Sequence, residues 1–199
     1  MPARKSNNPP RFLIIAGPNG SGKSTAYEQS VVELRGRAFR IINPDFLAKR
    51  LKDIEDIPAD AANVEALRRI EAWLETSILA GHSVGVETVL STGKYRRLVN
   101  KAKSLGFEIQ LIYVMLESVE LNVERVALRV RRGGHPVPEE KIRSRHEKSL
   151  AQLPWFFAQS ELALIYDNSG ATPRLVGQKK DGMSWVDVSA PDDLLNALM

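Results

Sequence analysis

The fold of this chain is constrained most by one stretch, in which an apolar run leads directly into a glycine-rich loop: RFLIIAGPNGSGKST at residues 11–25. The apolar run predicts a buried β-strand, and the pattern Gly-x-x-x-x-Gly-Lys-Ser predicts a P-loop that opens a helix. Its glycines let successive backbone N–H groups converge on one phosphate, where a side chain would block the approach. The stretch therefore predicts a strand, a phosphate-binding loop and a helix, in that order.

Each part of this loop has an expected task. Lys23 is expected to reach the terminal phosphates of a nucleoside triphosphate, and the Ser24 hydroxyl is expected to bind Mg²⁺. Ser24 or Thr25 begins the expected helix, whose N-terminus adds partial positive charge. The alternative is a Gly/Ser-rich turn without a ligand, which would not explain the strand before it and the helix after it. The residues predicted to bind the nucleotide in this loop are Gly17, Pro18, Asn19, Gly20, Ser21, Gly22, Lys23, Ser24 and Thr25.

The composition predicts one domain over residues 1–199, because no Gly/Ser-rich or Pro-rich linker divides the chain. Residues 1–10 are polar and Pro-rich and are expected to be a flexible N-terminus, and residues 170–199 are expected to form a C-terminal hairpin and a short helix. The absence of cysteine excludes disulfides and thiolate metal sites. No apolar run approaches about 20 residues and no signal-peptide pattern is present, so we expect a cytoplasmic protein with no membrane partner.

The net charge of +4 is concentrated in one segment. Residues 125–148 contain eight Lys and Arg and three Glu, whereas the remaining chain has 20 basic and 21 acidic residues. A local cluster fits neutralisation of phosphates at a site better than it fits a nucleic-acid-binding surface. We therefore expect no nucleic-acid partner, with a basic solvated helix as the alternative.

Strand and helix patterns alternate along the rest of the chain. They predict strands over 38–42, 83–90, 107–116 and 161–169, helices over 24–36, 46–51, 59–80, 91–105, 118–132 and from 138 onward, a hairpin turning at Asp181-Gly182, and a terminal helix from Pro191. Such alternation favours a doubly wound sheet with right-handed crossovers. The expected fold is α/β: a three-layer, kinase-like P-loop NTPase with a mostly parallel sheet, helices on both faces and a helical arginine lid.

The longest expected helix, over residues 59–80, has an apolar stripe at helical spacing. The stripe consists of Val64, Leu67, Ile70, Leu74 and Ile78. Gly81 is expected to end the helix as its C′ residue. This helix is expected to be scaffold.

Polar side chains follow the second and third expected strands. In parallel sheets ligands gather at the carboxyl ends of the strands, so Asp45, Glu87 and Thr88 should share the edge at which the P-loop lies. From the chain alone, Asp45 has two equal roles, a functional carboxylate or the N-cap of the helix over 46–51. Glu87 is costly to bury unpaired and should face a cation, a hydroxyl or water, with a structural salt bridge as the alternative.

The helix over 118–132 carries Arg125, Arg129 and Arg132 at i, i+4 and i+7, which places them in one stripe. Stacked like charges repel one another unless an anion lies over them, so the spacing favours a triphosphate at this face. The following residues, 133–138, combine two glycines and two prolines and are typical of a lid hinge. His135 is expected to make a lid contact, because no further metal-ligand cluster accompanies it.

Two further polar positions lie near the expected site. In the helix that follows Pro138, Arg145 lies at the edge of the apolar face, whereas Arg143 points about a third of a turn away, so Arg145 is the one expected to reach inward. Asp167, Asn168 and Ser169 end the fifth strand. Their short side chains can hydrogen-bond a base or can simply form the turn, and we include Asn168 and Arg129 among the predicted nucleotide-binding residues.

These features together predict a small P-loop kinase. Phosphoryl transfer needs cations over the developing charge and an acceptor for the substrate hydroxyl proton. Lys23, Arg132 and Arg145, with Mg²⁺, would supply the first, and Asp45 the second. A GTPase would need Asn-Lys-x-Asp, which the run at 100–103 lacks, and an oligomeric ATPase motor would need a strand-borne Asp-Glu pair. A nucleotide-sensing module without catalysis remains the alternative.

An ordered set of motifs between about residues 12 and 169 resembles the zeta toxin family, especially its short free-standing members. The set comprises Ala-Gly-Pro-Asn-Gly-Ser-Gly-Lys-Ser-Thr, Ile42-Asn-Pro-Asp45, Glu87-Thr88 with Leu90-Ser91, Arg129-Val-x-x-Gly-Gly-His-x-Val-Pro138, Arg145 and Ile165-Tyr-Asp-Asn-Ser169. Zeta toxins transfer the γ-phosphate of ATP to the 3′-hydroxyl of UDP-N-acetylglucosamine and are neutralised by an antitoxin. The resemblance therefore implies ATP and Mg²⁺, a sugar-nucleotide substrate and an antitoxin protein as partner.

The resemblance also implies roles for individual residues. Asp45 matches the catalytic base of the family, and Glu87 and Thr88 match its substrate-positioning pair. Arg132 and Arg145 match its two phosphate-clamping arginines, and Arg129 can take the place of Arg132 in that match.

Overall fold

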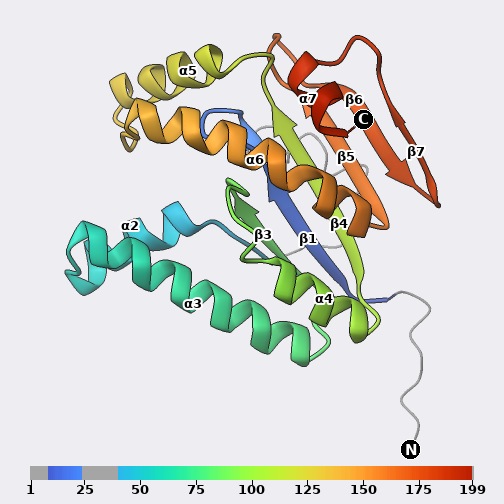
Figure 1. Cartoon of the computed structure of the whole chain (residues 1–199). Helices are drawn as coiled ribbons and strands as arrows, with labels where there is room; N and C mark the ends of the chain where they lie inside the picture. Colours follow the sequence, from blue (N-terminus) through green and yellow to red (C-terminus); the bar gives the residue numbers. More distant parts are fainter. Residues whose placement is uncertain (1–8, 24–39, 199) are drawn as a thin grey trace, which may run out of the picture.

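The structure is a computed structural model that describes residues 9–23 and 40–198 (Figure 1). Seven strands form one sheet in the order β2-β3-β1-β4-β5-β6-β7. The strands are β1 (Arg11–Ala16), β2 (Arg40–Ile42), β3 (Val84–Thr88), β4 (Glu108–Met115), β5 (Leu162–Asp167), β6 (Arg174–Lys180) and β7 (Met183–Val186). The first five pair in parallel, and β6 and β7 extend the sheet in antiparallel pairing. The predicted α/β fold with a mostly parallel sheet is confirmed.

Six helices belong to the described residues. They are α2 (Pro44–Glu55), α3 (Ala59–Leu79), α4 (Arg96–Ser104), α5 (Val119–Arg131), α6 (Glu139–Gln159) and α7 (Asp192–Leu198). The helix expected over 24–36 and most of the flexible N-terminus expected over 1–10 lie outside the described residues. Within the described ranges, no helix combines the length and the apolar character that crossing a membrane requires.

The core follows from the alternation of side chains along the strands. From β1, Phe12, Ile14 and Ala16 point to one face, where they join buried side chains of α3, α4, α6 and α7. Leu13 and Ile15 point to the other face and join a second cluster with β4 and β5. The helices that cover the first face thus belong to the described residues, and within those residues the second cluster contains side chains of strands alone.

The predicted apolar stripe of α3 is correct over its second half and wrong over its first. Ile70, Leu74 and Ile78 are buried, but Val64 and Leu67 are 69% and 37% exposed. The reason is a small separate core between α2 and α3, built largely from alanines. Its buried members are Ala48, Leu51, Ala62 and Ala66, so a different face of α3 meets α2.

Helix boundaries differ from the predictions where local backbone geometry intervenes. The helix expected from residue 91 begins at Arg96, after a turn in which Leu90 has a φ of +58°. By contrast, α5 begins as predicted, because the Ser118 hydroxyl caps it by accepting from the Leu121 N–H at 3.3 Å. The hairpin turns at Asp181-Gly182 with positive φ at both residues, as predicted.

Candidate active site

The P-loop leaves the carboxyl end of β1 in a conformation that requires glycine. Gly17 and Gly22 have φ values of +143° and +83°, which L side chains rarely adopt. A Cβ atom at Gly17 would overlap the Val114 carbonyl oxygen, and one at Gly22 would overlap the side-chain amide nitrogen of Asn168. Glycine is therefore needed here both for backbone geometry and for close contact with β4 and with the end of β5.

The Lys23 side chain folds back onto the first residues of its own loop. Its Nζ donates hydrogen bonds to the carbonyl oxygens of Gly17 at 2.9 Å and Pro18 at 3.0 Å. The residue is only 8% exposed. The ammonium group is thus held inside the loop that is predicted to bind phosphates. Ser24 and Thr25, the predicted metal ligand and helix start, lie outside the described residues.

The Ser21 hydroxyl bears on whether a phosphate fits this loop. Ser21 is fully buried, and its Oγ has no hydrogen-bond partner among the described residues. A buried hydroxyl without a partner costs free energy, and a phosphate oxygen is the kind of acceptor that would satisfy it. The glycine-lined backbone and this unsatisfied donor fit a bound phosphate group.

Three side chains from outside the loop hold it, two through its backbone and one through the Asn19 side chain. The amide Nδ2 of Asn168 donates to the Ser21 carbonyl oxygen at 2.8 Å, and Nδ2 of Asn122 donates to the Asn19 carbonyl oxygen at the same distance. The Arg145 guanidinium donates to Oδ1 of Asn19 at 3.3 Å. The P-loop is therefore fastened to α5, to α6 and to the segment after β5.

The structure gives Asn168 a role that the sequence did not indicate, support of the P-loop. Its Nδ2 supports the P-loop, and its backbone N–H donates to the Met115 carbonyl oxygen at 2.9 Å. Asn168 also lies inside the turn that Asp167 and Ser169 close, in which the Ser169 N–H donates to Oδ1 of Asp167 at 3.0 Å. Sequence reasoning missed the support role because Asn168 and Ser21 are far apart in the chain.

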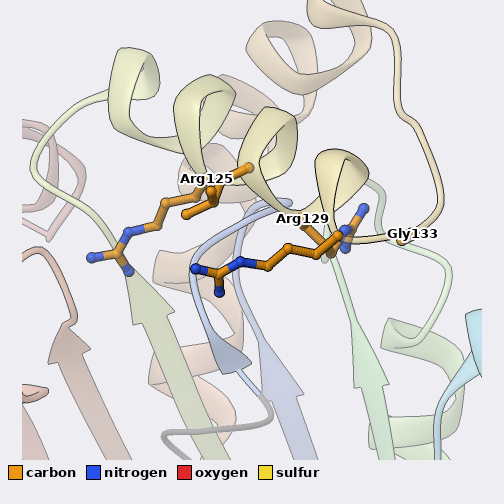
Figure 2. A pocket seen from close by; sticks show the side chains of 6 residues that line it. Arg125, Arg129 and Gly133 are labelled. Atoms are coloured by element: carbon orange, nitrogen blue, oxygen red, sulfur yellow. The ribbon is translucent and has the colours of Figure 1, made fainter.

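The arginine stripe of α5 lines a hollow above the carboxyl ends of the strands. Figure 2 shows the Arg125 and Arg129 side chains extending beneath α5, and Arg132 completes the set at the end of the helix. Arg125 donates to the Ser169 carbonyl oxygen at 3.1 Å, and Arg129 donates to that of His135 at 2.9 Å. The structure thus brings the three predicted arginines together, and Arg129 ties α5 to the hinge.

The two arginines of α6 point apart, as their spacing predicts. Arg145 reaches Asn19 of the P-loop, whereas Arg143 forms ion pairs with Glu120 of α5 and Glu139 of α6, each at 2.8 Å. The hydrogen bond from Arg143 lowers the pKa of the Glu120 carboxyl from its ordinary value. Arg145 is therefore the member of this pair that lies at the loop.

Glu87 and Thr88 end β3 directly beside the start of the P-loop. In the parallel register, Glu87 lies opposite Ile15 and Thr88 opposite Ala16, the residue before Gly17. The Thr88 hydroxyl oxygen accepts from the Leu90 N–H at 3.1 Å, which shapes the turn after the strand. Both predicted substrate-positioning residues are thus at the predicted edge of the sheet.

Of the two roles left open for Asp45, the structure contradicts the helix cap. Helix α2 begins at Pro44, so Asp45 lies in its first turn, and the cap is Asn43, whose Oδ1 accepts from the Phe46 N–H at 3.3 Å. Pro44 fits the first helical position because it has no N–H to satisfy. The position of Asp45 at the carboxyl edge follows from the pairing of β2 with β3, while its side chain lies outside the described part of the structure.

No side-chain cluster for a resident metal ion is found within residues 9–23 and 40–198. Groups of three or more His, Asp or Glu placed to hold a metal do not occur there. Ser24, the residue predicted to bind Mg²⁺, lies outside these ranges.

A family profile and a relative match most of the chain. The profile is described as an AAA domain (AAA_33) and matches residues 12–150. An uncharacterized protein of Haemophilus influenzae is 28% identical over 138 residues, which are 68% of this chain and 92% of the relative.

Two solved structures are similar in fold. A chain of the AvrRxo1-ORF1:AvrRxo1-ORF2 complex with ATP has a TM-score of 0.71 at 16% identity, over 96% of this chain and 64% of that one. A chain from the PezAT chromosomal toxin–antitoxin system of Streptococcus pneumoniae has a TM-score of 0.65 at 18% identity, over 98% of this chain and 78% of that one. This chain thus spans less than two thirds of the AvrRxo1 chain. At these identities the likeness concerns the fold.

Proposed function

The chain belongs to the AAA domain family, and we propose that it is an ATP-dependent small-molecule kinase of the zeta toxin type. It would transfer the γ-phosphate of ATP to a hydroxyl of a sugar nucleotide such as UDP-N-acetylglucosamine. The proposal depends on how the Lys and Arg side chains are arranged around the P-loop.

The observation that carries the proposal is the convergence of cationic side chains on one glycine-lined loop. Lys23 is buried within the loop, Arg145 contacts Asn19, and Arg125, one of the α5 arginines that line the hollow, lies beside Gly20. The transition state of phosphoryl transfer spreads negative charge over the phosphate oxygens, and preorganised cations stabilise that charge. A nucleotide sensor would need the loop but has no comparable need for arginines from two further helices.

The chain's own residues divide the chemistry as follows. Lys23 holds the terminal phosphates, and Arg132 and Arg145 stabilise the charge on the transferred group. Mg²⁺ when bound would neutralise further phosphate charge. Asp45 accepts the proton of the attacking hydroxyl, and Glu87 and Thr88 position the acceptor at the edge of β3.

The resemblance of the motifs to zeta toxins supports the sugar-nucleotide acceptor. The fold shared with a complex that contains ATP supports ATP as the donor, and the fold shared with a toxin–antitoxin system supports an antitoxin as protein partner. We include this partner in the proposal.

The test is to incubate the pure protein with ATP and Mg²⁺ and a panel of sugar nucleotides, and to look by mass spectrometry for a gain of one phosphate. UDP-N-acetylglucosamine is expected to be phosphorylated, and Lys23→Ala is the matched control that should abolish the product. Parallel reactions with free sugars and nucleosides test other hydroxyl acceptors. A phosphorylated free sugar and an unchanged sugar nucleotide would support a kinase for another small substrate. ATP binding without any phosphorylated product would support the sensor instead.

A further inference from the structure

A buried histidine links the C-terminal helix to the P-loop. His146 lies on α6, which packs against both α5 and α7 (Figure 1), and it is 3% exposed. Its Nδ1 lies 2.9 Å from Oδ1 of Asn122, and its Nε2 lies 3.2 Å from Oδ2 of Asp193. Because Asn122 also holds Asn19, a continuous chain of contacts runs from α7 to the P-loop.

The direction of each hydrogen bond in this chain is fixed by chemistry. The Asn19 carbonyl oxygen can only accept, so the amide nitrogen of Asn122 must face it. The Asn122 amide oxygen therefore faces His146, which requires a proton on Nδ1. An Asp193 carboxylate can also only accept, so its contact is a hydrogen bond only when Nε2 carries a proton as well. All contacts are satisfied together when His146 is an imidazolium.

Consecutive residues of α6 thereby act on the same loop residue. Arg145 bonds the side chain of Asn19, and His146 acts through Asn122 on its carbonyl oxygen. Asn19 is 7% exposed, and the next residue, Gly20, has a φ of +79°. A Cβ atom at Gly20 would lie only 2.8 Å from the Asn122 carbonyl oxygen, so the loop lies directly on α5.

We propose that His146 is a positioning residue, which Asp193 holds in the form that orients the Asn122 amide and thereby keeps the P-loop in its phosphate-binding shape. Without Asp193, neutral His146 can carry its proton on Nε2 instead, and Nδ1 then becomes an acceptor. Nδ1 of His146 and Oδ1 of Asn122 would then be two acceptors facing each other. If the Asn122 amide turned to avoid this, its oxygen would face the Asn19 carbonyl oxygen instead. Either arrangement weakens the hold on the loop.

The charged groups around His146 come from three elements. Asp193 belongs to α7 and Glu120 to α5, where Glu120 interacts electrostatically with His146. Arg143 and Arg145 are on α6 itself, and Arg143 is paired with Glu120. Asp193 is therefore the acidic group in direct contact with the imidazole.

Three variants of α7 test the proposal. Asp193→Ala removes the acceptor, and Asp193→Asn replaces it with an amide whose nitrogen can donate to an unprotonated Nε2 while Nδ1 keeps its proton. Asp192→Ala is the matched control, because it removes an exposed carboxylate from the same first turn. The dissociation constant of ATP with Mg²⁺ is measured by calorimetry from pH 6 to pH 9. Dividing each constant by the wild-type value at the same pH cancels the titration of the nucleotide.

The proposal rests on the nucleotide-binding part of the proposed function. We expect Asp193→Ala to weaken ATP binding about tenfold near pH 6.5, as for loss of a hydrogen bond to a charged group. Asp193→Asn should bind ATP more tightly than Asp193→Ala at every pH. Equal affinities for Asp193→Ala and Asp192→Ala would overturn the proposal, as would equal affinities for Asp193→Ala and Asp193→Asn.

A second measurement does not require a nucleotide. Nitrogen-15 shifts of the imidazole of His146 report the protons on Nδ1 and Nε2 directly, and the chain has only three histidines to assign. With both proteins at the same pH, we expect the wild type to carry a proton on each nitrogen that faces Asn122 and Asp193, and Asp193→Ala to lose one of them. A singly protonated wild-type ring would contradict the proposal. If the wild type fails to bind ATP while the ring is doubly protonated, the proposed function fails and the hydrogen-bond chain stands.

Discussion

The side-chain amide nitrogen of Asn168 lies 2.8 Å from the carbonyl oxygen of Ser21, which joins the end of β5 to the middle of the P-loop. The contact is buried, and a Cβ atom on Gly22 would overlap the donor nitrogen of Asn168. The shape of the phosphate-binding loop therefore depends on a residue that follows a strand two positions away in the sheet.

Asn168→Asp should weaken ATP binding about tenfold or more. The change replaces a buried donor by a carboxylate that faces the Ser21 carbonyl oxygen, and it adds negative charge beside the loop that is to bind phosphates. Calorimetric titration with ATP and Mg²⁺ measures the effect. Asn100→Asp makes the same substitution at an exposed position of α4 and should leave the affinity unchanged. Equal affinities for the two variants would contradict the support role of Asn168.

Lys23→Ala should lower the rate of phosphoryl transfer by about 10² or more, because it removes a preorganised cation from the transition state. The rate is followed with the acceptor identified in the sugar-nucleotide panel, and melting temperatures verify that the variant folds. Lys101→Ala, at an exposed position of α4, is the control. An unchanged rate in a folded Lys23→Ala variant would rule out the phosphate site.

Alanine at Arg132 or Arg145 should depress turnover strongly, whereas alanine at Arg131 or Arg143 should have little effect. Arg145 contacts the P-loop and Arg132 lines the hollow, but Arg143 is occupied with Glu120 and Glu139 in exposed ion pairs that contribute little. Initial rates at saturating ATP compare the four variants. Equal losses in all four would mean that the cluster acts only as a diffuse positive field.

Asp45→Asn should nearly abolish phosphoryl transfer while ATP affinity and melting temperature stay close to those of the wild type. An asparagine cannot accept the proton, and the loss of a general base costs about 10²–10⁴ in rate. Because Asn43 is the helix cap, Asn43→Ala is the matched control and should cost about 1 kcal/mol of stability with a smaller effect on the rate. If Asp45→Asn keeps more than about a tenth of the rate, the base is another group, and Glu87 is the next to test.

The acid limb of the stability profile should depend on Glu65. Hydrogen bonds from Arg68 and Arg69 lower the pKa of this carboxyl from 4.5 to about 2. A carboxyl whose pKa is lowered by folding stabilises the folded state at every pH above its ordinary pKa. This contribution is lost as the pH falls from 4.5 toward 2. Glu65→Gln should therefore flatten this part of a melting-temperature profile, with a small effect at neutral pH because the pairs are exposed. The same flattening in Glu147→Gln, an exposed control on α6, would contradict this assignment.

The sequence predicts the local features of this protein well, because they depend on neighbouring residues. The glycine pattern predicts the P-loop, Ser118 predicts the start of α5, and the helical spacing predicts that Arg145 rather than Arg143 approaches the loop. Each of these follows from a period or a cap within one element.

The remaining features depend on packing between distant elements. The first half of α3 turns a different face inward because α2 packs on its alanines, which its own apolar stripe does not reveal. Asn122 and His146 were not among the predicted site residues, since their partners lie on other elements. The sequence did contain a signal: Asn122 and His146 are polar residues at positions of α5 and α6 that face the protein interior. Such a pattern indicates a buried hydrogen bond but does not identify the partner residue.

The contact between His146 and Asp193 also has a consequence for how the chain folds during its synthesis. Translation adds α7 after every other element described here, whereas the P-loop emerges near the beginning. Domains begin to fold while the ribosome is still elongating the chain. A nascent polypeptide that has not yet reached Asp193 would have its phosphate-binding loop without this support. Ribosome-bound intermediates stalled before and after α7 should then differ in their retention on an ATP resin.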